Sequence, residues 1–88
     1  MIERNTMQAE IYTKPGCGYC IKAKALFDEK GISYKEYIIS AGLDEDKLGP
    51  NQFYVPRSQL LEKAPEAKTV PQIWLEGSYI GGYTELAA

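Results

Sequence analysis

The feature that most constrains the fold of this 88-residue chain is the pattern of residues 8–39. This pattern predicts a strand, a turn with two cysteines, a helix and a second strand. Residues 8–13 alternate as a strand does, and a Lys-Pro-Gly turn breaks the pattern. Apolar residues then recur at helical spacing up to Lys30, where Gly31 supplies a left-handed cap. Residues 33–39 are rich in strand-forming types, so the sequence predicts two parallel strands in a right-handed βαβ unit.

The second half of the chain predicts a helix and a hairpin. Residues 57–64 lie between two prolines and read as a short helix with one apolar face. Residues 72–75 and 78–81 are strand-like and are joined by a Glu-Gly pair, which is typical of a tight two-residue turn. A last helical segment is predicted from Tyr83 or the residue after it.

Chain length predicts one domain that spans residues 1–88. Residues 1–7 show no periodicity and are predicted to be a flexible N-terminus. The acidic stretch 40–56 reads as a long connection with one short helical turn near 44–48.

Charge and composition exclude several classes of function. The formal net charge is −2 and the pI is about 5.1, which argues against nucleic acid and anionic membrane as partners. The chain has no apolar run of the roughly 18 residues that a membrane span needs, and its polar start is unlike a signal peptide. We therefore expect a cytoplasmic protein. Because the chain has no histidine, a cysteine–histidine pair and a histidine metal ligand are both excluded.

The two cysteines, Cys17 and Cys20, are predicted to act in chemistry and not as a structural bridge. A bond between residues three apart closes almost no loop and stabilises little. Cys17 falls at the start of the predicted helix, where unpaired N–H groups, the helix dipole and the nearby Lys14 favour a thiolate. Such sites lower a cysteine pKa from about 8.5 to roughly 3.5–7.5. Cys20 lies one turn further, on the buried face, so we expect it to keep a higher pKa and to act second, as the resolving thiol.

Two other interpretations of the cysteine pair are less favoured. Both cysteines can be small core residues on an amphipathic helix, or they can form half of a structural zinc site. The zinc interpretation lacks a second pair of ligands, and the place of the pair within a βαβ unit favours redox chemistry.

Three segments resemble the signature segments of glutaredoxins, in order and at fitting distances. They are Lys14-Pro-Gly-Cys-Gly-Tyr-Cys20, Thr69-Val-Pro-Gln-Ile73 and Ile80-Gly-Gly-Tyr-Thr84. The resemblance implies an α/β protein with a thioredoxin-like fold, in which a four-stranded mixed sheet has helices on both faces and an antiparallel final pair of strands. It also implies a glutathione-dependent thiol–disulfide oxidoreductase that reduces protein disulfides and glutathionylated proteins. Some members of the family donate electrons to ribonucleotide reductase, so this partner is expected as well.

The resemblance further implies a glutathione site. Pro71 is expected to be cis, and Val70 before it is expected to pair through its backbone with the cysteinyl part of glutathione. Lys14 and Lys68 are expected to pair with the glycyl carboxylate. The alternative interpretation is that each is an ordinary solvated surface charge. The residues expected to line this site are Lys14, Tyr19, Lys68, Thr69, Val70, Pro71, Gly82, Tyr83 and Thr84, the last three holding the γ-glutamyl end.

Gly18 departs from the proline that is usual between the two cysteines of the family. Some family members with glycine or serine there bind a [2Fe-2S] cluster between two subunits, each of which supplies its first cysteine and a glutathione. A cluster carrier that uses Cys17 is therefore a second hypothesis, and without it we expect a monomer with no metal. A thioredoxin-like reductase recycled by a flavoprotein is a third hypothesis. The resemblance implies that Cys20 disfavours a dedicated cluster carrier, which more often lacks the second cysteine, and that the Gly-Gly-Tyr-Thr84 segment disfavours a thioredoxin. The final helix also reads as shorter than is usual in the family.

Overall fold

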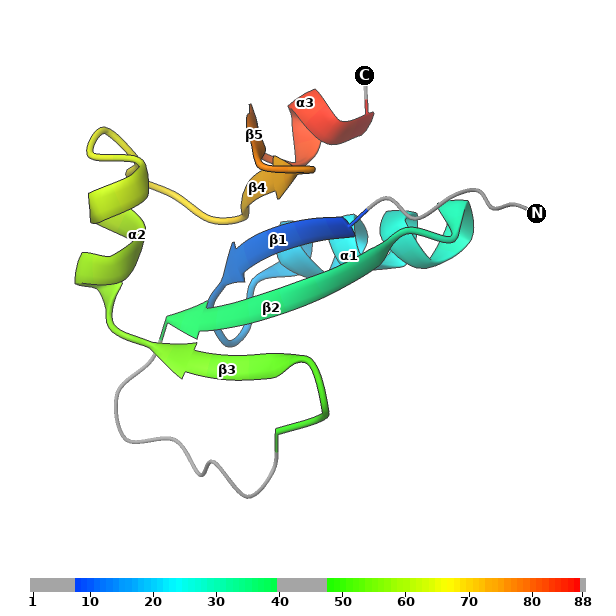
Figure 1. The fold of residues 1–88 in the computed structure, drawn as a ribbon, viewed down its shortest axis with the longest axis horizontal. Coiled ribbons are helices and arrows are strands. Elements are labelled where there is room, and N and C mark those ends of the chain that lie inside the picture. The colour runs from blue at the N-terminus through cyan, green and yellow to red at the C-terminus, as the bar shows by residue number, and fades with distance from the viewer. Residues whose placement is uncertain (1–7, 40–47, 88) are drawn as a thin grey trace.

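The computed structural model describes residues 8–39 and 48–87, which form a mixed sheet with helices on both faces (Figure 1). The strands are β1 (Gln8–Thr13), β2 (Ser33–Ile39), β3 (Gln52–Val55), β4 (Gln72–Leu75) and β5 (Ser78–Gly81). The helices are α1 (Gly18–Lys30), α2 (Arg57–Lys63) and α3 (Tyr83–Ala87). The strand order is β3-β2-β1-β4-β5, so β1 lies at the centre of the sheet.

The βαβ unit and the hairpin are both confirmed. β1 pairs in parallel with β2 from Gln8 opposite Ser33 to Thr13 opposite Ile38. β4 pairs antiparallel with both β1 and β5, and the turn between β4 and β5 has a positive φ at Glu76. The C-terminal end of β1, and the turn that follows it, therefore lie in the middle of the sheet, next to the start of β4.

The expected number of four strands is wrong, because residues 8–39 and 48–87 alone form a sheet of five. The additional strand β3 lies within the predicted connection 40–56 and pairs in parallel with β2. Phe53 stacks on Tyr37 with ring centroids 5.6 Å apart, and the Gln52 amide donates to Glu36 at 2.8 Å, so both faces of this short strand have partners on β2. The flexible N-terminus predicted for residues 1–7 and nearly all of the helical turn predicted at 44–48 lie outside the described residues.

Two apolar layers hold the sheet. On one face, α1 and α3 cover a cluster formed by Ala9, Ile11, Ala23, Phe27 and Ile73. On the other face, α2 covers a cluster formed by Tyr12, Val55, Leu60 and Trp74. Because alternate residues of β1 contribute to both layers, the central strand is fixed from both sides, and with it the position of the cysteine turn.

We expect Gly31→Ala to lower the free energy of unfolding by about 1 kcal/mol. Gly31 ends α1 with a φ of 71°, and a Cβ there would meet no atom within 4 Å, so the cost lies in the backbone alone. The matched control is Gly18→Ala, because a Cβ at this helical glycine also meets nothing within 4 Å. That control is expected to raise stability by about 0.4–1 kcal/mol. Urea denaturation followed by Trp74 fluorescence measures both changes, and equal losses in the two variants would contradict the explanation.

Candidate active site

The turn after β1 places Cys17 at the N-terminus of α1. Its backbone is extended, with φ −93° and ψ 108°, and its carbonyl accepts the N–H of Ile21 at 3.2 Å. The Cys17 Sγ accepts the backbone N–H of Cys20 at 3.1 Å. The sulfur therefore caps one of the N–H groups that a helix start leaves unpaired, as the sequence predicted.

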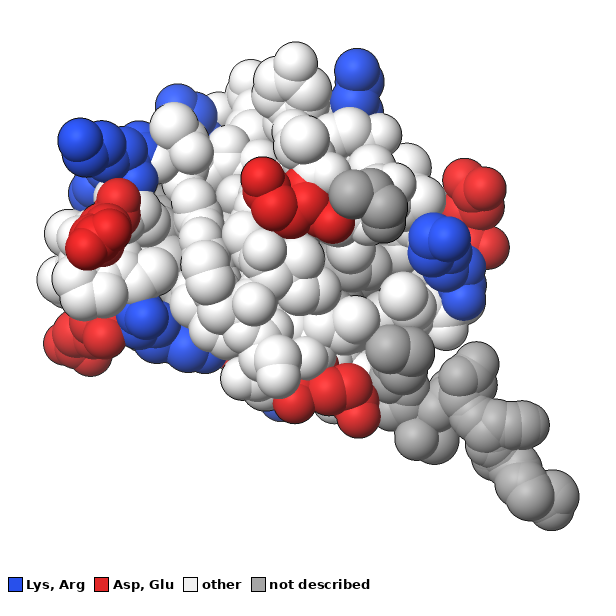
Figure 2. Space-filling view, turned by 90° about the horizontal axis from the view of Figure 1, so that it is seen from above, with Lys and Arg blue, Asp and Glu red and all other residues white. Residues whose placement is uncertain are grey.

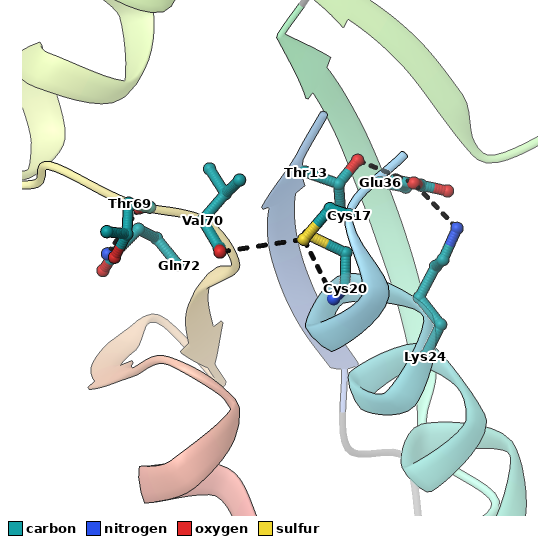
Figure 3. Close-up of a disulfide and its surroundings, with 8 residues drawn as sticks. All are labelled: Thr13, Cys17, Cys20, Lys24, Glu36, Thr69, Val70 and Gln72. Atoms are coloured by element: carbon teal, nitrogen blue, oxygen red, sulfur yellow. Dashed lines mark hydrogen bonds and ion pairs between the residues drawn. A yellow bond between two sulfur atoms is a disulfide. The ribbon is translucent and has the colours of Figure 1, made fainter. Parts of the chain in front are cut away.

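Cys17 and Cys20 form a disulfide in this structure, with Cα atoms 5.2 Å apart (Figure 3). Cys20 is 2% exposed and lies within the first turn of α1, whereas Cys17 is 8% exposed and lies at the helix end. The outer sulfur is thus the one that a thiol from solvent reaches first. Cys20 is placed to be the leaving and the resolving sulfur.

The loop before β4 lies next to the disulfide, with Val70 facing Cys17 (Figure 3). The Val70–Pro71 peptide bond is cis, as the resemblance implied. The carbonyl oxygen of Val70 lies 3.7 Å from Cys17 Sγ (Figure 3). Backbone groups of Val70 therefore flank the position at which a second sulfur would bond to Cys17.

A groove of about 600 Å³ lies along this loop and the start of α3. Tyr19 and Tyr83 stack in its lining, with ring centroids 5.9 Å apart and planes inclined by 29°. The groove brings together seven residues that the sequence analysis singled out from three separate segments: Tyr19, Thr69, Val70, Pro71, Gly82, Tyr83 and Thr84.

The two predicted lysines lie outside this groove. Lys14 lines a smaller pocket behind the disulfide, and Lys68 lines a neighbouring pocket of about 620 Å³ that shares Thr69 with the groove. Both side chains are exposed.

The glutaredoxin family model matches residues 9–80 of the chain. The chain belongs to the glutaredoxin family. The geometry of the cysteine pair, the cis proline loop and the groove agrees with this membership, and so does the thioredoxin-like sheet.

Several glutaredoxins are similar to this chain along most of its length. Glutaredoxin 1 of Rickettsia conorii is 39% identical over 72 residues, which cover 82% of this chain and 61% of the relative. Glutaredoxin 3 of Escherichia coli K12 is 35% identical over 79 residues, which cover 90% of this chain and 81% of the relative. The chain therefore spans about three fifths of the length of the first relative and four fifths of the second.

The crystal structure of glutaredoxin 1 from Francisella tularensis, solved in complex with cacodylate, superposes on this chain with a TM-score of 0.68 at 34% identity. The match covers 93% of this chain and 90% of that one. The solution structure of glutaredoxin from Brucella melitensis gives a TM-score of 0.63 at 31% identity, covering 97% of this chain and 80% of that one. The fold of this glutaredoxin is thus that of solved members of the family.

A buried carboxylate that the sequence analysis missed lies behind the disulfide. Glu36 is 4% exposed and accepts hydrogen bonds from Thr13 Oγ1 at 2.7 Å and Lys24 Nζ at 2.9 Å (Figure 3). It also accepts a hydrogen bond from Gln52 Nε2 at 2.8 Å. Burial acts to raise the pKa of Glu36, but the hydrogen bonds from its three partners and the Lys24 charge hold that pKa below its usual value of 4.5. The carboxylate is therefore ionised at neutral pH.

Glu85 is a second missed residue, and it lines the groove. Its Oε1 accepts the backbone N–H of Gly82 at 2.8 Å. A Glu three residues after the residue that precedes a helix, as Glu85 is after Gly82, is the second half of a capping box, so the sequence carried a signal for this contact. Gln72 and Tyr79 also line the groove, and the Tyr79 hydroxyl donates to Gln72 Oε1.

Within residues 8–39 and 48–87, no group of three or more Cys, Asp or Glu side chains gathers in a way that would hold a metal ion. Both sulfurs are joined to each other, so a [2Fe-2S] cluster on Cys17 would first need the disulfide to be reduced. Cluster binding stays a prediction. In the same part of the chain, no helix is long and apolar enough to cross a membrane.

Proposed function

We propose that this glutaredoxin is a glutathione-dependent thiol–disulfide oxidoreductase, with Cys17 as nucleophile and Cys20 as resolving thiol. The observation that carries the proposal is the position of Cys17 Sγ, at a helix N-terminus and 3.7 Å from the Val70 carbonyl oxygen. Val70 is also part of the lining of the groove of about 600 Å³, which is large enough for a tripeptide. The reactive sulfur and a site for its reductant are therefore adjacent.

The reaction consists of thiol–disulfide exchanges. The Cys17 thiolate attacks a substrate disulfide, a mixed disulfide forms on Cys17, and the other substrate sulfur leaves as a thiol. The Cys20 thiol then loses its proton and attacks Cys17 Sγ, which releases the second substrate thiol and forms the disulfide seen here. One glutathione thiolate attacks Cys17 Sγ and frees Cys20, and a second glutathione removes the first as oxidised glutathione.

We place glutathione in the groove with its cysteinyl backbone along Val70. Its γ-glutamyl end would lie against the backbone N–H groups of residues 83 and 84 and the Thr84 hydroxyl, since the Gly82 N–H donates to Glu85. Its glycyl carboxylate would point towards Lys68, which lines the neighbouring pocket, whereas Lys14 lies on another side. Figure 2 shows that the face at the top of Figure 1, which carries α3 and β5, is largely uncharged, with charged side chains scattered over it. A face with little charge can contact partner proteins of either sign of charge. Ribonucleotide reductase as a partner, a cytoplasmic location and a monomeric state remain predictions.

The test uses the purified full chain and a small mixed disulfide of glutathione as substrate. We expect turnover when glutathione and glutathione reductase are supplied, and none when a thioredoxin reductase replaces them. The opposite preference would make the chain a thioredoxin-like reductase. A coloured protein with iron–sulfur absorption and no turnover would favour a cluster carrier instead.

Thr84→Val is expected to raise the KM for glutathione about fivefold, because loss of one hydrogen bond costs about 1 kcal/mol. Thr84 is exposed at the start of α3, so valine disturbs no packing there. Its matched control is Thr84→Ser, which keeps the hydroxyl and is expected to leave the KM within twofold. An unchanged KM in the valine variant would remove Thr84 from the proposed glutathione site.

A further inference from the structure

Resolution and reduction both require a proton at a sulfur that solvent barely reaches. When a thiolate attacks Cys17 Sγ, the S–S bond breaks and its electron pair leaves on Cys20 Sγ. Cys20 is 2% exposed, and an unpaired anion in such a place is strongly disfavoured. The new thiolate must take up a proton, and the same proton must leave when Cys20 attacks a mixed disulfide.

A pocket of about 290 Å³ gives a route for this proton. Both cysteines line it together with Lys24 and Glu36. Its rim includes the exposed residue Ile21, so it joins the buried sulfur to the surface. Its volume is sufficient for several water molecules. The groove proposed for glutathione lies on another side, and its lining includes neither cysteine.

Lys24 is the lysine of α1 that lines this pocket together with Cys20. The two residues lie four apart in the same helix, which puts them on adjacent turns of one side. The Lys24 side chain is 26% exposed, whereas that of Glu36 is 5% exposed, and the Nζ–Oε2 distance is 2.9 Å. Lys24 therefore reaches both the buried carboxylate and solvent.

Glu36 fixes this arrangement from the sheet. Its position on β2 lies opposite Ile11 of β1 and Gln52 of β3, on the face covered by α1. A buried ion pair adds little net stability compared with apolar residues of the same volume. Glu36 also accepts hydrogen bonds from Gln52 of β3 and Thr13 of β1, but a neutral acceptor would suffice for those two contacts. They do not account for a charged pair with Lys24 behind the cysteines.

We propose that Lys24, held in place by Glu36, exchanges the proton of Cys20 with solvent through the pocket behind the disulfide. In reduction, the Lys24 ammonium gives a proton to the departing Cys20 thiolate and recovers one from water. In resolution, the proton follows the same path outwards. Glu36 is a positioning residue in this scheme, and the proposal rests on the proposed redox function of the cysteine pair.

The other ionisable groups around the pocket are Lys14 from the turn before α1, Cys17 at the helix start and Tyr54 from β3. Lys14 is exposed, and Tyr54 is paired with Ile38 of β2. A pH profile of the reduction rate includes these groups too, so the test must compare variants that differ only at Lys24 and Glu36.

The decisive variant is Lys24→Arg, which keeps the positive charge and the ion pair but stays protonated at all accessible pH values. We would measure, as a function of pH, the rate at which oxidised full chain is reduced by glutathione and, separately, by dithiothreitol. At neutral pH we expect Lys24→Arg and Lys24→Met to be at least about tenfold slower than wild type. Glu36→Gln should be slowed as well, because it releases Lys24. A Lys24→Arg profile that overlays that of the wild type overturns the proposal.

Two controls separate proton exchange from damage to the fold. Glu10→Gln breaks the exposed Lys63–Glu10 pair on the other face, where the Nζ–Oε1 distance is also 2.9 Å, and should leave the rate unchanged. In a Cys20→Ser background, attack of Cys17 on oxidised glutathione needs no proton at position 20, so Lys24→Arg should change that rate less than twofold. An equal slowing in either control overturns the proposal. The dithiothreitol rates test proton exchange even if glutathione proves not to be the reductant, so the two proposals fail separately.

Discussion

Cys17→Ser is expected to reduce glutathione-dependent turnover of a mixed disulfide by at least about 10³-fold, to the rate of the uncatalysed exchange. A serine hydroxyl cannot form a disulfide with the substrate, so the first step of the mechanism is lost. Serine is nevertheless a good N-cap, and its oxygen can accept the Cys20 N–H that Cys17 Sγ accepts now. The variant should therefore fold, which its urea denaturation curve would verify.

Residual turnover within tenfold of wild type in Cys17→Ser would contradict the assignment of the nucleophile. Cys20 would then have to react directly with substrate, although it is 2% exposed. The position of Cys17 at the helix N-terminus would in that case be unrelated to the reaction.

Cys20→Ser is expected to separate two activities of the protein. Reduction of a protein disulfide should fall by about 10²-fold, because a thiol held in the same chain has a far higher effective concentration than free glutathione. Reduction of a glutathione mixed disulfide should change less than about threefold, because glutathione itself can resolve that intermediate. Parallel assays with the two substrates measure this difference.

Ala23→Ser provides the control for Cys20→Ser. Ala23 is fully buried on the same face of α1, so this change also adds a hydroxyl to the core but removes no thiol. It should lower stability while leaving the ratio of the two activities unchanged. A similar change of the ratio in both variants would mean that packing of α1, and not the Cys20 thiol, controls the reaction.

Local patterns were sufficient to predict most of the fold. The alternation in residues 8–13 and the Gly31 cap predicted the ends of β1 and α1, because both depend on neighbouring residues alone. β3 was missed because its four residues lie between Gly-Pro and Pro, which are typical of a loop. Its stability as a strand comes from contacts with Tyr37 and Glu36, far away in the sequence.

The site residues that belong to a sequence motif were predicted, and those that join the site only through tertiary contacts were missed. Seven of the predicted residues line one groove because their segments follow β1, precede β4 and follow β5, and these three strand ends are neighbours in the antiparallel part of the sheet. Glu36 gave no signal, because the strand 33–39 was predicted from its strand-forming residue types, which do not tell whether a polar residue among them is buried. Only the pairing of β2 with β1 and β3, together with the packing of α1, shows that this carboxylate is buried behind the cysteines.

Intact-mass analysis of the Cys20→Ser variant after brief exposure to oxidised glutathione tests the central claim most directly. The account predicts one glutathione per chain, located by peptide mapping on Cys17, and no adduct in Cys17→Ser over the same time. Formation of the adduct on Cys20 in Cys17→Ser at a comparable rate, or the absence of any adduct in Cys20→Ser, would contradict it.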